Sequence, residues 1–383
     1  MMQNRPTRIL YFVSEDWYFW SHRLPVARKA RDQGFKVTVA TRVTAHGDLI
    51  RSEGFELAPI SLDRSGMNPI IELRSLWQVY KIYRAVKPDI VHHVALKPAL
   101  YGSWAAALTG VPAILNAYAG LGHLFTTASS RLALARLIFT FGMIAIQRLR
   151  GTWSLFQNDD DRALFTNLGI AAAERSSTIR GSGVDVDYFH PPQSYPTGVP
   201  IALLASRMLK TKGVEDFVET ARILQKRGVP IRMALAGEPD PYNPASVTEE
   251  WLQSVAKEGV VEYMGRIDDM PAALALASIA VLPSHYREGL PKSLLEAAAA
   301  GLPIVAFDIP GCREIVRNEV NGLLTPSRDQ IELADALERL ARDRDLRMRW
   351  GAVSRKIAVE EFSDTIVADQ TFELYEQLLQ TRK

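Results

Sequence analysis

Short apolar runs alternate with longer helical stretches along this chain, and the alternation restricts the possible folds more than any other feature. In the first half, the runs that are typical of buried strands lie at residues 8–13, 36–41, 90–94, 113–117 and 153–157. The stretch 70–86 has helical periodicity, with Leu73, Leu76, Tyr80 and Tyr83 on one apolar face. Such a strand–helix alternation predicts β-α-β units and a parallel sheet.

The same pattern restarts after a segment rich in proline and glycine, at residues 190–200. Further strands are predicted at residues 200–205, 231–236, 260–264, 279–283 and 304–307. A chain of 383 residues suits two domains. We therefore predict an α/β protein with two doubly wound, Rossmann-like domains, at 1–190 and 200–364, and a cleft between them. Ligands of such sheets bind at the carboxyl ends of the strands.

Composition narrows the compartment and the partners. The single cysteine, Cys312, excludes an internal disulfide and suits a reducing cytoplasm. A formal net charge of +2 gives no indication of a nucleic-acid partner. The apolar run at 8–13 is too short for a signal peptide. No run approaches the roughly 20 apolar residues that a membrane-spanning helix requires.

The segment Glu288-Gly-Leu-Pro-Lys-Ser-Leu-Leu-Glu296 carries the clearest chemical signal. Pro291 fits the first position of a helix, so Glu288 precedes this helix and Glu296 lies inside it. Helical rise separates the two carboxylates by roughly 8–10 Å. The free N–H groups and the dipole at the helix start favour an anion between them. Two carboxylates that can hold hydroxyls, on either side of a phosphate-binding helix start, suit a nucleotide-diphosphate sugar.

Several linked segments resemble glycosyltransferase family 4, whose members carry a Glu-x7-Glu motif in a two-domain fold called GT-B. In chain order these segments are residues 204–213, 265–270, 288–296, 301–308, 311–316 and 321–324. The resemblance is strong over about residues 180–330 and weaker in the first half. It implies that a last helix, within residues 365–383, crosses back to the first domain.

The resemblance implies a donor site in the second domain. Arg207 would clamp the diphosphate, and Lys212 would take the charge that develops on the β-phosphate. Arg266 and Ile267 would offer backbone groups to the base, and Glu296 would accept hydrogen bonds from both ribose hydroxyls. Glu288 would contact the sugar hydroxyls or support positive charge at the anomeric carbon. The predicted donor contacts are Arg207, Lys212, Arg266, Ile267, Glu288, Gly289, Leu290, Lys292 and Glu296.

The family's reaction chemistry follows from the same resemblance. It implies a retained anomeric configuration, by a front-face departure in which the leaving phosphate accepts the proton of the incoming hydroxyl. No protein nucleophile is needed in such a reaction. The predicted catalytic residues are Arg207, Lys212, Glu288 and His123. His123 follows Gly120-Leu-Gly and is expected to face the cleft, where it could orient the acceptor or the donor.

Acceptor contacts are expected from the first domain. Residues 14–23 are rich in aromatic side chains where many family members have a glycine-rich loop, so they are a candidate acceptor wall. His22 belongs to this segment, although it could simply cap or pack in a helix. His92, His93 and Lys97 are expected to follow the strand that ends near Val94. A cation there could meet an acceptor phosphate; the alternative is a loop that only packs.

Three segments of the first half, at residues 64–69, 95–105 and 120–122, resemble the capsule and O-antigen branch of the family. The first of them contains Arg64. With His22 and Lys97, Arg64 completes the predicted acceptor contacts. The branch implies an acceptor carried on a polyprenyl diphosphate at the cytoplasmic face of the bacterial inner membrane.

No metal or other cofactor is predicted. Asp159, Asp160 and Asp161 could be mistaken for the metal-binding carboxylates of the other major glycosyltransferase fold. They follow a strand and Asn158, however, where acidic residues cap a helix and complement its dipole. Asp268 and Asp269 also have the pattern of a helix cap, and the histidines and the cysteine show no zinc spacing.

Charge is distributed unevenly in the first half. Residues 90–158 contain no Asp or Glu, and the basic residues in this stretch are Lys97, Arg131, Arg136, Arg148 and Arg150. The arginines lie at the ends and within an apolar helix predicted at 131–148. Basic residues beside apolar ones suit an anionic membrane surface. The alternative is a buried helix, which explains the apolar residues but not the missing carboxylates.

The sequence therefore predicts a retaining glycosyltransferase, cytoplasmic and peripherally bound to the inner membrane. It would move a sugar, with N-acetylhexosamine as the first candidate, from a UDP-sugar to a lipid-linked glycan. Three alternatives remain open: transfer to a soluble acceptor, a GT-B UDP-sugar 2-epimerase, and a nonenzymatic protein that binds sugar nucleotides.

Overall fold

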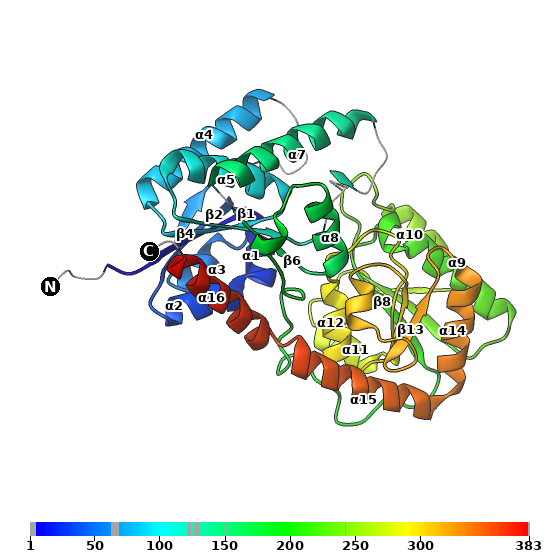
Figure 1. Ribbon diagram of the computed structural model, residues 1–383. Helices are drawn as coiled ribbons and strands as arrows, with labels where there is room; N and C mark the ends of the chain where they lie inside the picture. The colour runs from blue at the N-terminus through cyan, green and yellow to red at the C-terminus, as the bar shows by residue number, and fades with distance from the viewer. Residues whose placement is uncertain are drawn as a thin grey trace. The chain divides into compact units, whose positions relative to one another are not determined.

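The computed structural model describes residues 5–62, 69–120, 124–125, 130–150, 152–241 and 243–381. The chain divides into two compact units (Figure 1). The first comprises Met1–Ser182 together with Asp364–Lys383, and the second is Gly183–Ser363. Each unit is built on a parallel sheet, so the prediction of two Rossmann-like α/β domains is confirmed.

The first sheet has seven strands in the order β3-β2-β1-β4-β5-β6-β7. Their bounds are β1 Arg8–Glu15, β2 Lys36–Arg42, β3 Glu56–Pro59, β4 Ile90–Val94, β5 Ala113–Tyr118, β6 Trp153–Phe156 and β7 Ser176–Thr178. The order reverses between β1 and β4. Such a reversal is the topological switch point beside which doubly wound sheets bind ligands.

The second sheet has six strands in the order β10-β9-β8-β11-β12-β13. Their bounds are β8 Ile201–Ala205, β9 Arg232–Ala236, β10 Glu262–Tyr263, β11 Ile279–Leu282, β12 Ile304–Phe307 and β13 Gly322–Thr325. Here the switch point lies between β8 and β11, because the chain leaves β8 toward one side of the sheet and returns at β11 on the other.

Helices connect the strands in both units. In the first unit they are α1 Asp16–His22, α2 Leu24–Asp32, α3 Gly47–Ser52, α4 Pro69–Val86, α5 Leu96–Thr109, α7 Ser130–Arg150, α8 Asp159–Asn167, η1 Ala173–Arg175 and α16 Asp364–Gln380. In the second unit they are η2 Lys210–Lys212, α9 Val214–Lys226, α10 Glu249–Lys257, α11 Met270–Leu276, α12 Lys292–Ala299, α13 Cys312–Ile315, α14 Gln330–Arg342 and α15 Arg344–Glu361.

Both faces of each sheet are buried under helices. Side chains alternate between the faces of a strand, and the central strands are apolar on both. In β8, Leu204 and its neighbour Leu203 pack into two separate apolar clusters. In β1, Tyr11 and Phe12 do the same in the first unit. Continuous apolar runs are what strands covered on both faces require, which is why these strands were recognisable from sequence.

Three short strands were not predicted from the sequence. They are β3, β7 and β13, of which β3 and β7 form the two edges of the first sheet and β13 forms an edge of the second. The residues of β7 are Ser-Ser-Thr, without the apolar run that marks a buried strand. The expected apolar face of the helix at 70–86 is also only partly correct. Tyr83 is buried in α4, but Leu73 is exposed, because Ser75, Val79 and Tyr83 form the buried stripe.

The boundary between the units lies at Gly183 rather than at residue 190. The backbone N–H of Val184 donates to the carbonyl of Phe362 at 3.0 Å, which ties this segment to the end of α15. The guanidinium of Arg355 also donates to the carbonyls of Val186 and Phe189, both at 2.8 Å. These contacts place residues 183–190 in the second unit.

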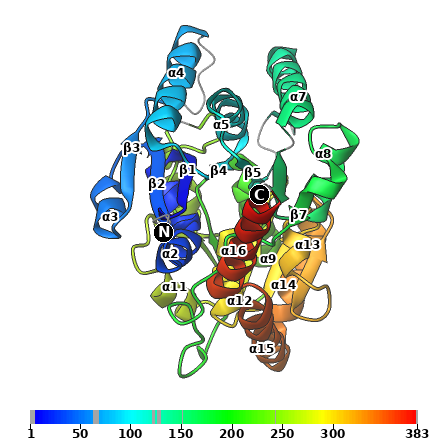
Figure 2. The same cartoon turned by 60° about the vertical axis from the view of Figure 1, so that its left-hand side comes forward.

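The last helix, α16, belongs to the first unit. It lies beside α2 in Figures 1 and 2, with the rings of Phe35 and Phe372 in contact at 5.2 Å between centroids. The hydroxyl of Tyr375 shares hydrogen bonds with the hydroxyl of Tyr11 at 3.1 Å and with Nδ1 of His92 at 2.5 Å. This buried polar contact fixes the rotation of α16 against the sheet.

Candidate functional site

A hollow of about 470 Å³ opens at the carboxyl edge of the second sheet. The loops after β8, β9 and β10 line it, together with residues of α11 and α12. Four of the predicted donor contacts belong to its lining: Arg207, Arg266, Ile267 and Glu296. The hollow thus lies where parallel sheets of this kind bind ligands, and its size suits a nucleotide.

Two glycines let the loops of the site approach one another. Gly237 follows β9 with φ +137°, and a Cβ there would lie 1.8 Å from the carbonyl oxygen of Ser206 after β8. Its N–H donates to the carbonyl of Gly265 at 2.7 Å, so three loops meet at this residue. Gly213 has φ +76°, and a Cβ there would lie 1.9 Å from the carbonyl oxygen of Pro283. Any larger residue would separate η2 from the loop after β11.

Arg207 lies at the rim of the hollow and is held by an acidic partner. Its Nη1 donates to Oδ2 of Asp240 at 2.7 Å, while 42% of its side chain stays exposed. The N–H of Asp240 in turn donates to Oγ of Ser246 at 2.9 Å. An exposed guanidinium with one carboxylate partner keeps donors directed at solvent, where a diphosphate can reach them.

Lys212 and Glu288 form an ion pair beside the hollow rather than in its lining. Nζ of Lys212 lies 2.6 Å from Oε1 of Glu288, with side-chain exposures of only 19% and 12%. Oγ of Ser284 lies 2.9 Å from the same carboxylate oxygen and 3.0 Å from the carbonyl of Thr211. Ser284 therefore links the Lys212 turn to Glu288. Both predicted catalytic charges are present and adjacent, and each currently neutralises the other.

Glu296 differs from the other acids of the site. It lies in α12, half-buried, and lines the hollow. Among the residues described, its carboxylate makes no hydrogen bond and no ion pair, so its acceptor capacity is unused. Burial raises its pKa to about 7, although the nearby charge of Lys292 acts in the opposite direction. A desolvated carboxylate of this kind is stabilised when a ligand donates hydroxyl hydrogen bonds to it.

The helix that carries Glu296 begins one residue later than predicted. Pro291 is its N-cap, with φ −68° and ψ 115°, and no side chain caps the first turn. Leu290 is partly buried and packs on the apolar cluster under α12. Gly289, Leu290 and Lys292 therefore lie at the helix start and outside the lining of the hollow. Because no side chain caps it, the positive end of the α12 dipole favours an anion.

In the first unit, two predicted acceptor contacts already have partners. His22 ends α1, where its Nδ1 lies 2.6 Å from Oγ of Ser21 and its ring stacks on Tyr18 at 4.1 Å. Nζ of Lys97 lies 2.6 Å from Oε1 of Glu72, which neutralises the lysine. Arg64 and His123 lie outside the described residues.

His92 and His93 do not follow β4 but lie inside it, fully buried. Burial lowers the pKa of both rings, that of His93 to about 4. His93 is held between Asn116 at 2.7 Å and the hydroxyl of Tyr83 at 2.9 Å. Of the two alternatives left open for this segment, packing therefore holds for both histidines, which are neutral parts of the core.

The acidic triplet forms the first turn of a helix whose N-cap is Asn158. It opens α8, where the side chain of Asn158 accepts from the N–H of Asp161 at 2.8 Å. Asp269 likewise caps α11, by accepting from the N–H of Ala272 at 3.0 Å. Within the described ranges, no group of three or more His, Cys, Asp or Glu residues is placed to hold a metal ion.

Some residues of the site were missed from sequence. Asp240, Gly237 and Ser284 all follow strands at the carboxyl edge of the second sheet. The position of the Gly-Glu-Pro-Asp loop directly after β9 could have indicated that it belongs to the ligand site. The pairing of Asp240 with Arg207 was not readable, because the two residues are far apart in the chain.

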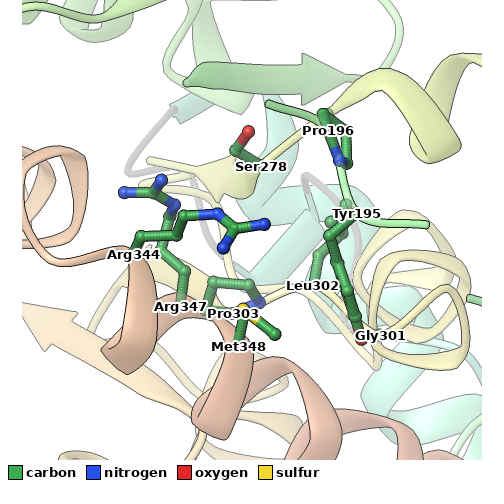
Figure 3. Close-up of a pocket in the computed structure, with 10 residues that line it drawn as sticks. Tyr195, Pro196, Ser278, Gly301, Leu302, Pro303, Arg344, Arg347 and Met348 are labelled. Carbon is green, nitrogen blue, oxygen red and sulfur yellow. The ribbon is translucent and has the colours of Figure 1, made fainter. Parts of the chain in front are cut away.

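A smaller hollow of about 20 Å³ lies at the opposite edge of the same sheet, where Ser278 precedes β11 and Pro303 precedes β12. Figure 3 shows Arg344 and Arg347 of α15 on one side of it and Tyr195 on the other. Nη1 of Arg347 donates to the carbonyls of Leu340 and Ala341 at the end of α14. This arginine therefore caps a helix, and the space is too small for a substrate.

Comparison with known proteins agrees with this description of the fold. A family model described as "Glycosyl transferases group 1" matches residues 199–343, and one described as "Glycosyl transferase 4-like" matches residues 8–149. Two such sheets, with a nucleotide-sized hollow at the carboxyl edge of the second, define a glycosyltransferase of the GT-B fold. More particularly, the chain belongs to glycosyltransferase family 4, and it is an enzyme.

Curated relatives extend over nearly the whole chain. N,N'-diacetylbacillosaminyl-diphospho-undecaprenol alpha-1,3-N-acetylgalactosaminyltransferase of Campylobacter jejuni is 26% identical over 93% of this chain and 95% of its own length. UDP-Gal:alpha-D-GlcNAc-diphosphoundecaprenol alpha-1,3-galactosyltransferase of Escherichia coli is 25% identical over 80% of each chain.

The fold is also that of a solved structure. Sucrose-phosphate synthase from Thermosynechococcus elongatus superposes with a TM-score of 0.81 at 21% identity. The match covers 98% of this chain and 100% of that one. In the part of the chain that the structure describes, no helix is long and apolar enough to cross a membrane.

Proposed function

We propose that this glycosyltransferase moves a hexose or N-acetylhexosamine from a UDP-sugar to a glycan carried on a polyprenyl diphosphate. The observation that carries the donor side is the unpaired, desolvated carboxylate of Glu296 in a hollow that Arg207 borders. A ribose supplies two hydroxyl donors to this carboxylate, and a diphosphate supplies the anion for Arg207 and for the positive end of the α12 dipole. The acceptor side is supported by the names of the two relatives, both of which act on diphospho-undecaprenol substrates.

The proposed reaction keeps the configuration of the anomeric carbon. The bond between the anomeric carbon and the β-phosphate oxygen breaks, and a bond to the acceptor oxygen forms on the same face. The proton of the acceptor hydroxyl passes to the departing phosphate oxygen. Lys212 releases Glu288 and meets the charge of the leaving diphosphate, while Glu288 turns to the sugar. No metal is needed in this proposal, because Arg207, Lys212 and a helix N-terminus meet the diphosphate charge.

The paired charges of Lys212 and Glu288 suit this exchange. At 2.6 Å they hold each other in the ligand-free site, so neither is left buried and uncompensated. A diphosphate offers the lysine a second anionic partner, and the sugar hydroxyls offer donors to the carboxylate. The donor therefore replaces the pair with two new contacts rather than leaving one charge without a partner.

The test has two stages. A panel of UDP-, GDP- and ADP-sugars is screened for thermal stabilisation, and the stabilising sugars are then incubated with a synthetic polyprenyl-diphosphate-linked saccharide. We expect stabilisation by UDP-sugars and a product that an α-specific glycosidase cleaves when the donor is an α-linked sugar. Transfer only to a soluble acceptor, or from a GDP- or ADP-sugar alone, would contradict the proposal.

A further inference from the structure

Helix α7 is apolar on two faces, of which only one is covered. Its inner face packs toward α5 through Phe139, Met143 and Ile146, which are all buried. Gly142 allows close contact, since a Cβ there would lie 2.7 Å from Cδ1 of Leu100. The outer face carries four large apolar side chains that are each more than half exposed: Leu134, Leu137, Ile138 and Phe141. Their spacing of i, i+3, i+4 and i+7 places them in one stripe.

Helix α4 carries a second exposed stripe. Ile70 is 80% exposed, and Leu73 and Trp77 are each more than half exposed. Further along the same helix, Nζ of Lys81 lies 5.3 Å from the ring centroid of Trp77. The guanidinium of Arg84 likewise lies 5.8 Å from that of Tyr80. The first part of this helix face is therefore apolar. The later part is aromatic, with basic side chains above the rings.

The two stripes lie on neighbouring parts of the first unit. Both helices pack on α5, and Figure 2 shows α4 and α7 on either side of it. Every other helix in the described ranges carries at most one large apolar side chain that is exposed. A concentration of exposed apolar surface on the two helices that flank α5 marks an interaction site rather than ordinary scatter.

Charge indicates which partner covers this surface. Residues 90–158, which include all of α5 and α7, contain no Asp or Glu, and α7 alone carries four arginines. The single acid of α4, Glu72, is paired with Lys97. A second copy docked through α7 would bring two basic helices without acidic residues together across a twofold axis. An anionic lipid surface instead offers a complementary charge to the arginines and a hydrocarbon layer to the apolar stripe.

We propose that the outward faces of α4 and α7 form a membrane-docking surface for an anionic bilayer. The side chains Leu134, Leu137, Ile138 and Phe141 enter the boundary between headgroups and acyl chains, and the exposed basic residues Lys81, Arg84 and Arg148 remain among the headgroups. The helices lie along the surface and do not cross it. This inference rests on the proposed function in one respect: a lipid-linked acceptor gives the first unit a reason to stay at the bilayer.

The first experiment measures vesicle co-sedimentation of the full chain. Wild type is compared with the stripe variant Leu137→Gln/Ile138→Gln/Phe141→Gln. The control is Leu276→Gln/Ile331→Gln, whose two sites are equally exposed apolar positions of the second unit. With phosphatidylglycerol vesicles, we expect the stripe variant to lose roughly tenfold in partitioning and the control to match wild type. High salt should weaken wild-type binding without abolishing it, and phosphatidylcholine vesicles should bind less.

A second experiment locates the insertion. The one native cysteine, Cys312, is buried, so Phe141→Cys can be labelled selectively with an environment-sensitive fluorophore. We expect a blue shift when phosphatidylglycerol vesicles are added, and none for labelled Ile331→Cys. Equal sedimentation of the stripe variant and wild type, or no blue shift at position 141, would overturn the proposal. A wild-type dimer that the stripe variant converts to a monomer would assign the surface to a second copy instead.

The outcome is separable from that of the proposed function. Thermal stabilisation by UDP-sugars should be equal in all variants, because the donor hollow belongs to the other unit. Vesicle binding together with transfer to a soluble saccharide alone would leave the docking surface standing and refute the lipid-linked acceptor. Transfer to the lipid-linked acceptor without vesicle binding would refute the docking surface alone.

Discussion

Replacing Glu296 by glutamine should make the ligand-free protein more stable and its donor binding weaker. Burial raises the pKa of this carboxyl to about 7, from an ordinary value of 4.5. Between these two values the unfolded chain has released a proton that the folded protein still binds, so stability falls as the pH rises from about 4.5 to about 7. At pH 8 the full cost of about 2.5 pKa units is present, which is roughly 3 kcal/mol. Glutamine cannot ionise and avoids this cost.

The same ionisation should govern donor affinity. Only the ionised form of Glu296 accepts hydrogen bonds from both ribose hydroxyls. With a pKa of about 7, about a tenth of the protein molecules carry this carboxylate at pH 6 and about nine tenths carry it at pH 8. Affinity for a UDP-sugar should therefore rise about tenfold across this interval. Glu296→Gln should remove the pH dependence and cost about 1.5–3 kcal/mol of binding at pH 8, the usual value of a hydrogen bond to a charged group.

Two measurements check this prediction. Calorimetric titration with a UDP-sugar between pH 6 and 8 gives the affinity. A UDP-sugar is used rather than free UDP, because its esterified diphosphate has no proton to lose in this pH range. Thermal unfolding without ligand gives the stability of each variant. The matched control is Glu332→Gln, an exposed glutamate of α14 in the same unit. The reasoning fails if Glu296→Gln binds the donor as tightly as wild type with the same pH profile, or if it lowers the melting temperature at pH 8.

Three further predictions concern turnover. Arg207→Ala and Lys212→Met should each lower turnover at least about 100-fold, the cost of removing one charge-stabilising donor. The control Lys210→Met should keep normal turnover, because Lys210 pairs with Glu215 at the surface. Normal turnover in both site variants would show that the donor binds elsewhere. Activity should survive EDTA, and a complete loss that Mn²⁺ or Mg²⁺ restores would make Asp159, Asp160 and Asp161 candidate ligands. UDP should be released only when an acceptor is present, apart from slow hydrolysis; conversion of a UDP-N-acetylhexosamine to its C2 epimer without acceptor would favour the epimerase alternative.

Much of the fold could be predicted because its determinants are local. The central strands are continuous apolar runs, since helices cover both of their faces, and the helices between them have their own period. The short edge strands β3 and β7 lack such runs and were missed. Residues 183–190 were assigned to the wrong unit because their partners, Phe362 and Arg355, come almost at the end of the chain.

Part of the lining of the hollow could be predicted, since acids and bases directly after strands meet at one edge of a parallel sheet. Arg207, Arg266, Ile267 and Glu296 do lie around one hollow. Sequence could not tell which charges are already paired. The sequence around Lys97 shows no acidic partner, but in the structure Oε1 of Glu72 on another helix lies 2.6 Å from Nζ of Lys97.

The sequence by itself determined the class of fold, the edge of the sheet at which chemistry is possible, and the types of charge present there. Each of these depends on residue type and spacing along a single segment. Tertiary structure alone decided the state of those charges, namely that Glu296 is desolvated and that Lys212 is held by Glu288. It also decided that no described element covers the outer stripe of α7. Burial and pairing depend on which distant segment packs against a residue, and periodicity carries no information about that partner.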